Sequence, residues 1–229
     1  MNLGRRLTTV AVIAVAVLVP FALLSIMVVG GWPPLHDADA SITAAVHDWA
    51  LRNPEWVDVT VWWTNIFDPN PLRVAALGLV IWLWRRGHRG AGMWVVTTMA
   101  AGGLLGIVIK LLIERHRPSF LDPVARAAGY SFPSGHALNA TLAAGVFVLV
   151  LLPVVRRRWL LWTAGVAVTL LTALSRVVLG VHWTSDVTAG ILLGVAVIAA
   201  TTMAFTHRGL LPVVERGVDP SLHTEKAQA

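Results

Sequence analysis

The sequence lacks cysteine altogether and is poor in charged residues. Without cysteine the chain has no disulfide, no thiolate nucleophile and no cysteine-based metal site, and its redox compartment stays undetermined. Asp, Glu, Lys and Arg make up 13% of the 229 residues, against about 25% in soluble globular domains. A water-soluble globular domain is therefore not expected.

Apolar residues take the place of the missing charges. They form 56% of the chain, and the mean hydropathy is +0.71, which predicts a polytopic, all-α membrane protein folded as one helical bundle. The net charge of +6 and the pI near 11.2 would at first suit nucleic acid. The arginines are dispersed between apolar runs, however, so we interpret them as membrane anchors and topology signals and expect no nucleic-acid partner.

Six stretches are candidates for membrane-spanning helices, which need roughly 17–25 mostly apolar residues. They are 8–30, 71–85, 91–113, 137–155, 159–179 and 184–206. The second stretch is short on its own, and Asp68-Pro69-Asn70-Pro71 should break any continuous helix before it. We expect one domain over residues 1–207 and a polar cytoplasmic tail over 208–229.

The first stretch follows Arg5-Arg6 and invites comparison with a signal peptide. Its apolar run is longer than the roughly 7–15 residues of a signal core, and Ala38-Asp39-Ala40 lies too far beyond it to serve as the cleavage site. We therefore predict an uncleaved helix. Residues 36–60 mix acidic residues with tryptophan, which is typical of a helix lying at the outer interface.

The distribution of basic residues predicts the orientation. Arg5-Arg6, Arg85-Arg86 and Arg156-Arg157-Arg158 fall on one side if the N-terminus is cytoplasmic. Both termini are then cytoplasmic in a multi-pass plasma-membrane protein, and residues 31–70, 114–136 and 180–183 lie on the outer face.

Two polar clusters interrupt the apolar sequence before residue 137. Lys110 and Arg117-Pro118 are about two helical turns apart, which would place both cations on one helix face if the helix ends just before the proline. In Phe132-Pro133-Ser134-Gly135-His136, Ser134 is a favoured N-cap, Gly135 permits close backbone approach, and a helix start attracts anions.

The third cluster runs from Ser175 to Asp186 and contains Arg176 and His182. His182 and Asp186 are four apart, so on a helix they would share a face, and the carboxylate could hold the imidazole in one tautomer. Two predicted crossings separate the second cluster from the third. All three clusters are therefore expected at one outer pocket.

The expected pocket combines three cations with two histidines. Lys110, Arg117 and Arg176 would suit an oxyanion such as phosphate. A histidine backed by a carboxylate is suited to nucleophilic attack, and a second histidine can act as general acid. The fixed cations could balance transition-state charge, so we expect neither a metal nor a cofactor.

These clusters resemble the signature motifs of the type 2 phosphatidic acid phosphatase (PAP2) superfamily. K-x6-RP, PSGH and SR-x5-H-x3-D occur in the family's order, and every position that they specify is filled here. The positions are Lys110, Arg117, Pro118, Pro133, Ser134, Gly135, His136, Ser175, Arg176, His182 and Asp186.

The resemblance implies an integral-membrane lipid phosphatase with an extracytoplasmic site. It implies that His182 forms a phosphohistidine, Asp186 orients His182, and His136 protonates the leaving group and then activates water. The implied phosphate cradle is Lys110, Arg117, Ser134, Gly135 and Arg176.

Several alternatives stay open on the sequence alone. Lys110 and Arg117 could be snorkelling anchors. We expect Arg115, His116 and Arg126 to be solvated or to contact lipid headgroups, and Glu114 to be an ion-pair partner of Arg115 or Arg117.

The function also has alternatives. The phosphohistidine could pass phosphate to another lipid or sugar hydroxyl, or the protein could be a lipid-phosphate binder or transporter. Polyprenyl pyrophosphate, phosphatidylglycerophosphate and phosphatidic acid all remain candidate substrates, and the oligomeric state does not follow from the sequence.

Overall fold

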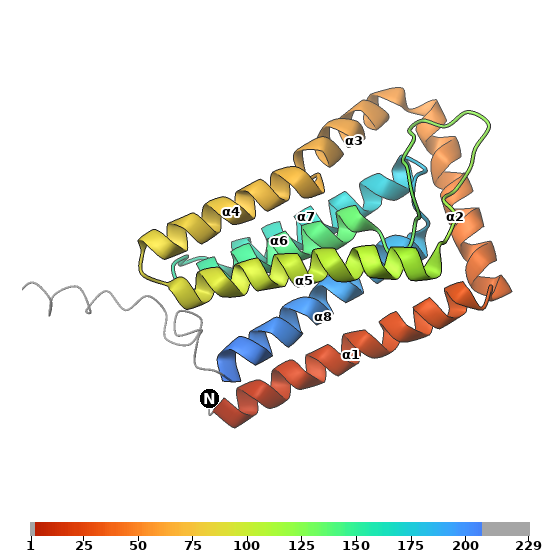
Figure 1. Cartoon of the computed structure of the whole chain (residues 1–229). Coiled ribbons are helices and arrows are strands. Elements are labelled where there is room, and N and C mark those ends of the chain that lie inside the picture. Colours follow the sequence, from red (N-terminus) through yellow and green to blue (C-terminus); the bar gives the residue numbers. More distant parts are fainter. Residues whose placement is uncertain (1–2, 208–229) are drawn as a thin grey trace, which may run out of the picture.

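Every regular element in the described part of the chain is an α-helix. The computed structural model describes residues 3–207, in which no strand occurs (Figure 1). The helices are α1 (Leu3–Val29), α2 (Pro33–Arg52), α3 (Pro54–Ile66), α4 (Pro69–Arg85), α5 (Arg89–Ile113), α6 (Gly135–Leu151), α7 (Arg158–Val178) and α8 (Thr184–His207). The predicted all-helical class is confirmed, whereas the predicted tail lies outside the described residues.

Prolines and one aspartate fix where α2, α3 and α4 begin. Each of these helices has proline in its first turn, where the missing N–H has no intrahelical acceptor to lose. Asp68 caps α4 by accepting a hydrogen bond from the backbone N–H of Asn70 at 3.0 Å. Between α1 and α2 the helix axis bends by 91°, and Gly31 in that turn has a φ of 60°, which glycine adopts without steric cost.

Helices occupy all six predicted stretches, but fewer than six meet the length and hydropathy expected of a membrane span. Four segments of the described chain do so: Pro54–Arg85, Arg89–Ile113, Arg158–Val178 and Thr184–His207. The bent pair Ala14–Val29 and Pro33–Arg52 makes a fifth if it counts as one span. Helix α6 is apolar but only 17 residues long.

The predicted break at Asp68-Pro69 is confirmed, because α3 ends at Ile66 and α4 begins at Pro69. The stretch 71–85, expected to be short, nevertheless belongs to a 32-residue segment formed by α3 and α4. Residues 36–60, expected as one interfacial helix, are divided between α2 and α3.

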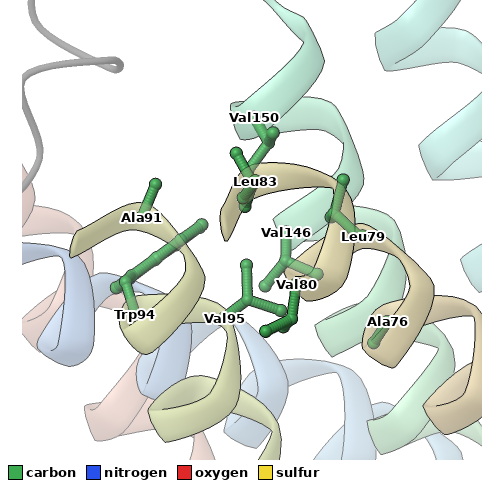
Figure 2. Packing of buried hydrophobic residues seen from close by; sticks show 9 residues of the cluster. All are labelled: Ala76, Leu79, Val80, Leu83, Ala91, Trp94, Val95, Val146 and Val150. Carbon is green, nitrogen blue, oxygen red and sulfur yellow. The ribbon is translucent and has the colours of Figure 1, made fainter. Parts of the chain in front are cut away.

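Helix α6 lies inside the bundle and packs against α4, α5, α7 and α8. At the end remote from its first residue, Val146 and Val150 meet Leu83 of α4 and Trp94 of α5 in a core from which solvent is excluded (Figure 2). Helix α1 covers α8 from the other side. Because α6 begins at Gly135, the second polar cluster stands at the start of an enclosed helix.

The three polar clusters meet at one end of the bundle, as expected. In Figure 1 the loop after α5, the turn between α7 and α8, and helix α2 lie together at that end. The start of α1, the α4–α5 turn and the α6–α7 turn lie at the opposite end. Basic residues mark these opposite turns: α4 ends at Arg85, α5 begins at Arg89 and α7 begins at Arg158.

Helix α8 lies so close to the start of α6 that adding one methyl group at Gly190 should lower the stability of the protein. A Cβ on Gly190 of α8 would lie 2.6 Å from the backbone carbonyl oxygen of Ser134. We expect Gly190→Ala to destabilise the protein by about 1–3 kcal/mol, because overpacking against backbone outweighs the better helix propensity of alanine. Thermal unfolding in detergent measures this. Gly78→Ala, where a Cβ meets nothing within 4 Å, is the control; equal melting temperatures for the two variants would contradict the prediction.

Candidate active site

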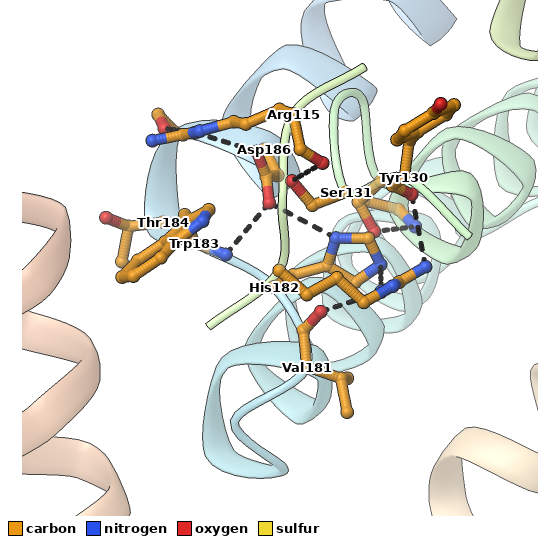
Figure 3. A network of polar contacts seen from close by, with 12 residues as sticks. Arg115, Tyr130, Ser131, Val181, His182, Trp183, Thr184 and Asp186 are labelled. Atoms are coloured by element: carbon orange, nitrogen blue, oxygen red, sulfur yellow. Dashed lines mark hydrogen bonds and ion pairs between the residues drawn. The ribbon is translucent and has the colours of Figure 1, made fainter. Parts of the chain in front are cut away.

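His182 lies in the turn between α7 and α8 and is 2% exposed. Its Nδ1 is 3.3 Å from Oδ2 of Asp186, whose side chain is completely buried (Figure 3). The same carboxylate oxygen accepts a hydrogen bond from the backbone N–H of Trp183 at 2.9 Å. Since α8 begins only at Thr184, the expectation that both residues share a helix face is wrong; the contact spans the turn that leads into the helix.

The second ring nitrogen of His182 faces a cation. Nη1 of Arg117 lies 3.0 Å from Nε2 of His182. A guanidinium can only donate hydrogen bonds, so Nε2 accepts and Nδ1 carries the proton that is donated to Asp186. The arrangement therefore presents a neutral imidazole with the Nε2 lone pair directed towards the cationic part of the site.

Backbone carbonyl groups hold the two cations of the first cluster. Arg117 donates to the carbonyl oxygens of Gly129 at 2.8 Å and Val181 at 2.7 Å. Nζ of Lys110 donates to the carbonyl oxygen of Tyr130 at 2.6 Å, and Arg117 reaches the same oxygen at 3.2 Å. The loop thus brings both cations to one carbonyl group, which a surface anchor would not require.

The helix that carries Lys110 ends earlier than predicted. Glu114 has a φ of 51°, in the left-handed region, and α5 stops at Ile113 rather than just before Pro118. Lys110 and Arg117 consequently do not share a helix face. They meet because the loop after α5 folds back.

The second cluster connects α6 to the third cluster and to Asp68, the cap of α4. Ser134 is the N-cap of α6, as predicted, and its side chain accepts from the N–H of Ala137 at 3.5 Å. The backbone N–H of Ser134 donates to the carbonyl oxygen of Asp186 at 2.9 Å. His136 lies in the first turn of α6, with Nε2 3.1 Å from Oδ2 of Asp68. A second histidine–carboxylate pair is therefore present.

Arg176, near the end of α7, is a buried third cation. Its Nη1 donates to Oγ1 of Thr64 at 2.9 Å, while its buried Nε has no hydrogen-bond partner within residues 3–207. Its charge lies close enough to Arg117 and His136 to interact with both. A buried N–H that lacks an acceptor is suited to an incoming anion.

A Cβ on Gly135 would meet nothing within 4 Å, so the backbone at the start of α6 borders open space.

The expectation that Arg115 is solvated or contacts headgroups is wrong. Arg115 forms ion pairs of 2.8 Å with Asp39 and with Asp186, and its side chain is 13% exposed. It also lies over the ring of Trp183, with 5.5 Å between the guanidinium carbon and the ring centroid. Arg126, in contrast, is exposed, as expected.

The expected ion pair of Glu114 is also not found. Glu114 accepts a hydrogen bond from the hydroxyl group of Tyr130 at 2.7 Å. Among the described residues it forms no ion pair with Arg115, which pairs with other carboxylates, or with Arg117, which binds carbonyl groups.

Sequence reasoning missed Asp39, Asp68 and the role of Arg115. Asp68 precedes Pro69-Asn70-Pro71, so its position as a helix cap could have been recognised, but its contact with His136 could not. Asp39 and Arg115 follow no motif spacing. Their partners are far away in the chain, and no local pattern indicates such contacts.

A cavity of about 270 Å³ adjoins the cationic part of the site. Its apolar wall includes Met27 and Trp32 from the bend between α1 and α2, and its polar wall includes Arg115 and Arg117. The cavity therefore joins an apolar wall to cationic side chains at the edge of the site.

The fold and the site together define a class. The chain is a multi-pass helical membrane protein in which a buried histidine–carboxylate pair and three cations gather at one end of the bundle.

The chain belongs to the PAP2 superfamily, whose family model matches residues 91–209. It is similar to the undecaprenyl-diphosphatase of Sulfolobus acidocaldarius, with 37% identity over 111 residues, which are 46% of this chain and 51% of that protein. It is also similar to phosphatidylglycerophosphatase B of Bacillus subtilis, with 33% identity over 125 residues, 53% of this chain and 60% of that one. The chain thus spans between half and two thirds of the length of these curated relatives.

The fold is also that of a solved PAP2 structure. The transmembrane PAP2-type phosphatidylglycerolphosphate phosphatase from Bacillus subtilis superimposes with a TM-score of 0.77 at 24% identity, over 85% of this chain and 96% of that chain. Unlike the family model, this match extends over most of the chain.

Burial gives His182 an unusual proton affinity. Removal from water is the largest influence on the pKa of His182; Asp186 opposes it, Arg117 and Lys110 reinforce it, and together they lower the pKa from 6.5 to about 4. The imidazole is therefore predominantly neutral at neutral pH. The midpoint of its titration in the ¹⁵N NMR spectrum of the histidine-labelled protein should lie well below 6.5, with His182→Gln used for assignment. A midpoint at or above 6.5 would contradict the burial argument.

Proposed function

We propose that the protein is a membrane phosphatase that hydrolyses a lipid phosphate monoester or diphosphate through a phosphohistidine on His182. The observation that carries the proposal is the pairing of His182, with Nδ1 on Asp186 and Nε2 beside Arg117. Such an arrangement suits a neutral imidazole nucleophile next to a cation that can bind phosphate, which supports the proposal. The names of the relatives, undecaprenyl-diphosphatase and phosphatidylglycerophosphatase B, support a lipid phosphate as the substrate.

Binding of the phosphate group uses donors whose acceptors within the protein are neutral or absent among the described residues. Arg117 and Lys110 donate to loop carbonyl groups, and Nε of Arg176 has no acceptor among the described residues. The oxygens of a phosphate are stronger acceptors than carbonyl groups and can take over these donors. Ser134 and Gly135 complete the cradle at the start of α6, where the helix dipole favours an anion.

The first chemical step transfers the phosphoryl group to the enzyme. Nε2 of His182 attacks phosphorus, the bond from phosphorus to the leaving oxygen breaks, and protonated His136 gives its proton to that oxygen. Asp186 stabilises the positive charge that develops on the phosphorylated imidazole. Lys110, Arg117 and Arg176 balance the negative charge of the equatorial oxygens, which makes a metal-independent mechanism our proposal.

The second step regenerates the enzyme. His136, now neutral, accepts a proton from water as the water oxygen attacks phosphorus. The bond from phosphorus to Nε2 breaks, inorganic phosphate leaves, and His182 returns to its neutral form while His136 is again protonated. Asp68 contacts Nε2 of His136 and can stabilise the protonated state in both steps.

We also propose the membrane placement. Six crossings, including the 17-residue helix α6, would place both termini in the cytoplasm of a plasma-membrane protein and the site on its outer face. The basic residues at the turns opposite the site support this orientation. A cationic site beside the apolar wall of Met27 and Trp32 supports a substrate whose tail stays in the lipid layer.

Phosphate release tests the proposed activity and the nucleophile. Purified protein in detergent should release phosphate from undecaprenyl diphosphate, phosphatidylglycerophosphate or phosphatidic acid, also with a chelator present. Vanadate, which can take a trigonal bipyramidal geometry, should inhibit. His182→Ala should lower kcat by about 10³-fold or more, because it removes the nucleophile.

Three results would contradict parts of this scheme. Activity retained in His182→Ala would contradict a phosphohistidine on His182. Full loss of activity with chelator would contradict the metal-independent mechanism. Binding of all three lipids without turnover would favour a binder or transporter instead. Product analysis with a lipid alcohol present separates the hydrolase from a phosphotransferase.

Replacing Asp68 tests its proposed support of His136. Asn is as good an N-cap as Asp, so Asp68→Asn keeps α4 capped and removes only the charge beside His136. We expect kcat to fall by about ten- to a hundredfold, part of the ~10²–10⁴ that general acid–base catalysis contributes. Asp58→Asn on the exposed face of α3 is the matched control. Equal kcat values in the two variants would leave Asp68 as a helix cap alone.

A further inference from the structure

Arg115 stands between two buried carboxylates. Its Nη1 donates to Oδ1 of Asp186 at 2.8 Å, and its Nη2 donates to Oδ2 of Asp39 at 2.8 Å. The side chains of Asp39 and Asp186 are 1% and 0% exposed. Two carboxylates so far from water are costly unless a cation and hydrogen bonds compensate them, and Arg115 serves both at once.

Asp39 fastens helix α2 to the first turn of α8. Its oxygens accept hydrogen bonds from the backbone N–H of Ser185 at 2.9 Å and from the hydroxyl groups of Thr184 and Ser185. The hydroxyl group of Ser185 is also 2.6 Å from Nη1 of Arg115. The N-terminus of α8 is thus held by a carboxylate from a helix that lies outside the stretch matched by the family.

These contacts leave Asp186 a single orientation. Arg115 takes Oδ1, while the N–H of Trp183 and Nδ1 of His182 share Oδ2 (Figure 3). If Arg115 were absent, Oδ1 of Asp186 would be a buried oxygen that has lost its charged hydrogen-bond donor, which costs free energy. Rotation of the carboxylate would lower this free-energy cost. Such a rotation would also remove Oδ2 from His182.

We propose that Arg115 and Asp39 are positioning residues of the reaction: together they hold Asp186 so that its Oδ2 keeps His182 in the reactive orientation. Neither residue belongs to the proposed phosphate cradle. The kinetic part of this inference rests on the proposed phosphatase function, whereas its structural part concerns the hydrogen bond between His182 and Asp186 and needs no turnover.

Because of the charges around His182, removing the charge of Arg115 and removing the charge of Asp39 should shift the pKa of His182 in opposite directions. Asp186 faces the imidazole from α8, Arg117 from the loop, Lys110 from α5 and the second titratable imidazole, His136, from α6. Arg115 contacts the far oxygen of Asp186. Removing the charge of Arg115 leaves the negative charge of Asp186 less compensated, which raises the pKa of His182. Removing the charge of Asp39 leaves Arg115 less compensated, which lowers the pKa of His182.

The kinetic test compares Arg115→Gln, Arg115→Lys and Asp39→Asn with two matched controls. The controls are Arg126→Gln in the same loop and Asp48→Asn on α2, both at exposed positions. With the best of the three lipids as substrate, Arg115→Gln should lower kcat about ten- to a hundredfold, because misorientation weakens the nucleophile, and should change KM less than about threefold. Arg115→Lys should recover part of kcat, and the controls should stay within about twofold of wild type.

The pH profile separates positioning from a merely structural role. The acid limb of kcat/KM should move to higher pH in Arg115→Gln and to lower pH, or not at all, in Asp39→Asn. If kcat/KM of Arg115→Gln falls by the same factor at every pH and the acid limb does not shift, Arg115 has a structural role only. A rise in KM at unchanged kcat would place Arg115 against the substrate and overturn the proposal.

A second readout is independent of activity and of any substrate. The Nδ1 proton of His182, deshielded by its hydrogen bond to Asp186, should move upfield and exchange faster with water in Arg115→Gln and Asp39→Asn, but not in Arg126→Gln. If wild type turns over none of the lipids while this change occurs, the proposed function fails and the positioning pair stands. An unchanged proton signal in folded Arg115→Gln overturns the positioning pair even if wild type is active.

Discussion

The site depends on compensating one buried carboxylate. Asp186 has no contact with solvent, and an ionised carboxylate in such a place is tolerated only where donors surround it. The donors come from separate parts of the chain: Arg115 from the loop after α5, and His182 and the N–H of Trp183 from the turn before α8. Burying this charge therefore requires the loop and the turn to be in place together.

The backbone at Asp186 extends the same constraint to α6. Its carbonyl oxygen accepts from the N–H of Ser134, and Gly190, one turn further along α8, allows the carbonyl group of Ser134 to approach closely. The side chain of Asp186 thus contacts the imidazole of His182 directly, while its main chain fixes the start of the helix that carries the second histidine, His136.

Much of this arrangement follows from the sequence, and the missing parts have a common physical cause. Apolar runs located the helices because lipid exposure leaves a strong compositional signal. The pairing of His182 with Asp186 was predicted correctly but for an incorrect reason, since the i, i+4 spacing acts here across a turn rather than along a helix. Glu114 ends α5 early with a left-handed φ, and because it is not a glycine the sequence gives no signal for this helix end. Asp39, Asp68 and Arg115 find their partners only after the chain has folded, and periodicity and spacing do not encode such contacts.

The partners of the cations also divide them by role. Lys110 and Arg117 are held by neutral carbonyl groups, and Arg176 by one hydroxyl group, so a doubly charged phosphate can compete for all three. Arg115 is held by two buried carboxylates, and withdrawing it towards a ligand would leave both without their charged donor. Arg115 is therefore the cation near the site that is least suited to bind substrate, although it is only two residues from Arg117. Under the proposed mechanism, the charge of the partner that each cation has within the protein decides which cations are available to the phosphate group and which keep the nucleophile in place.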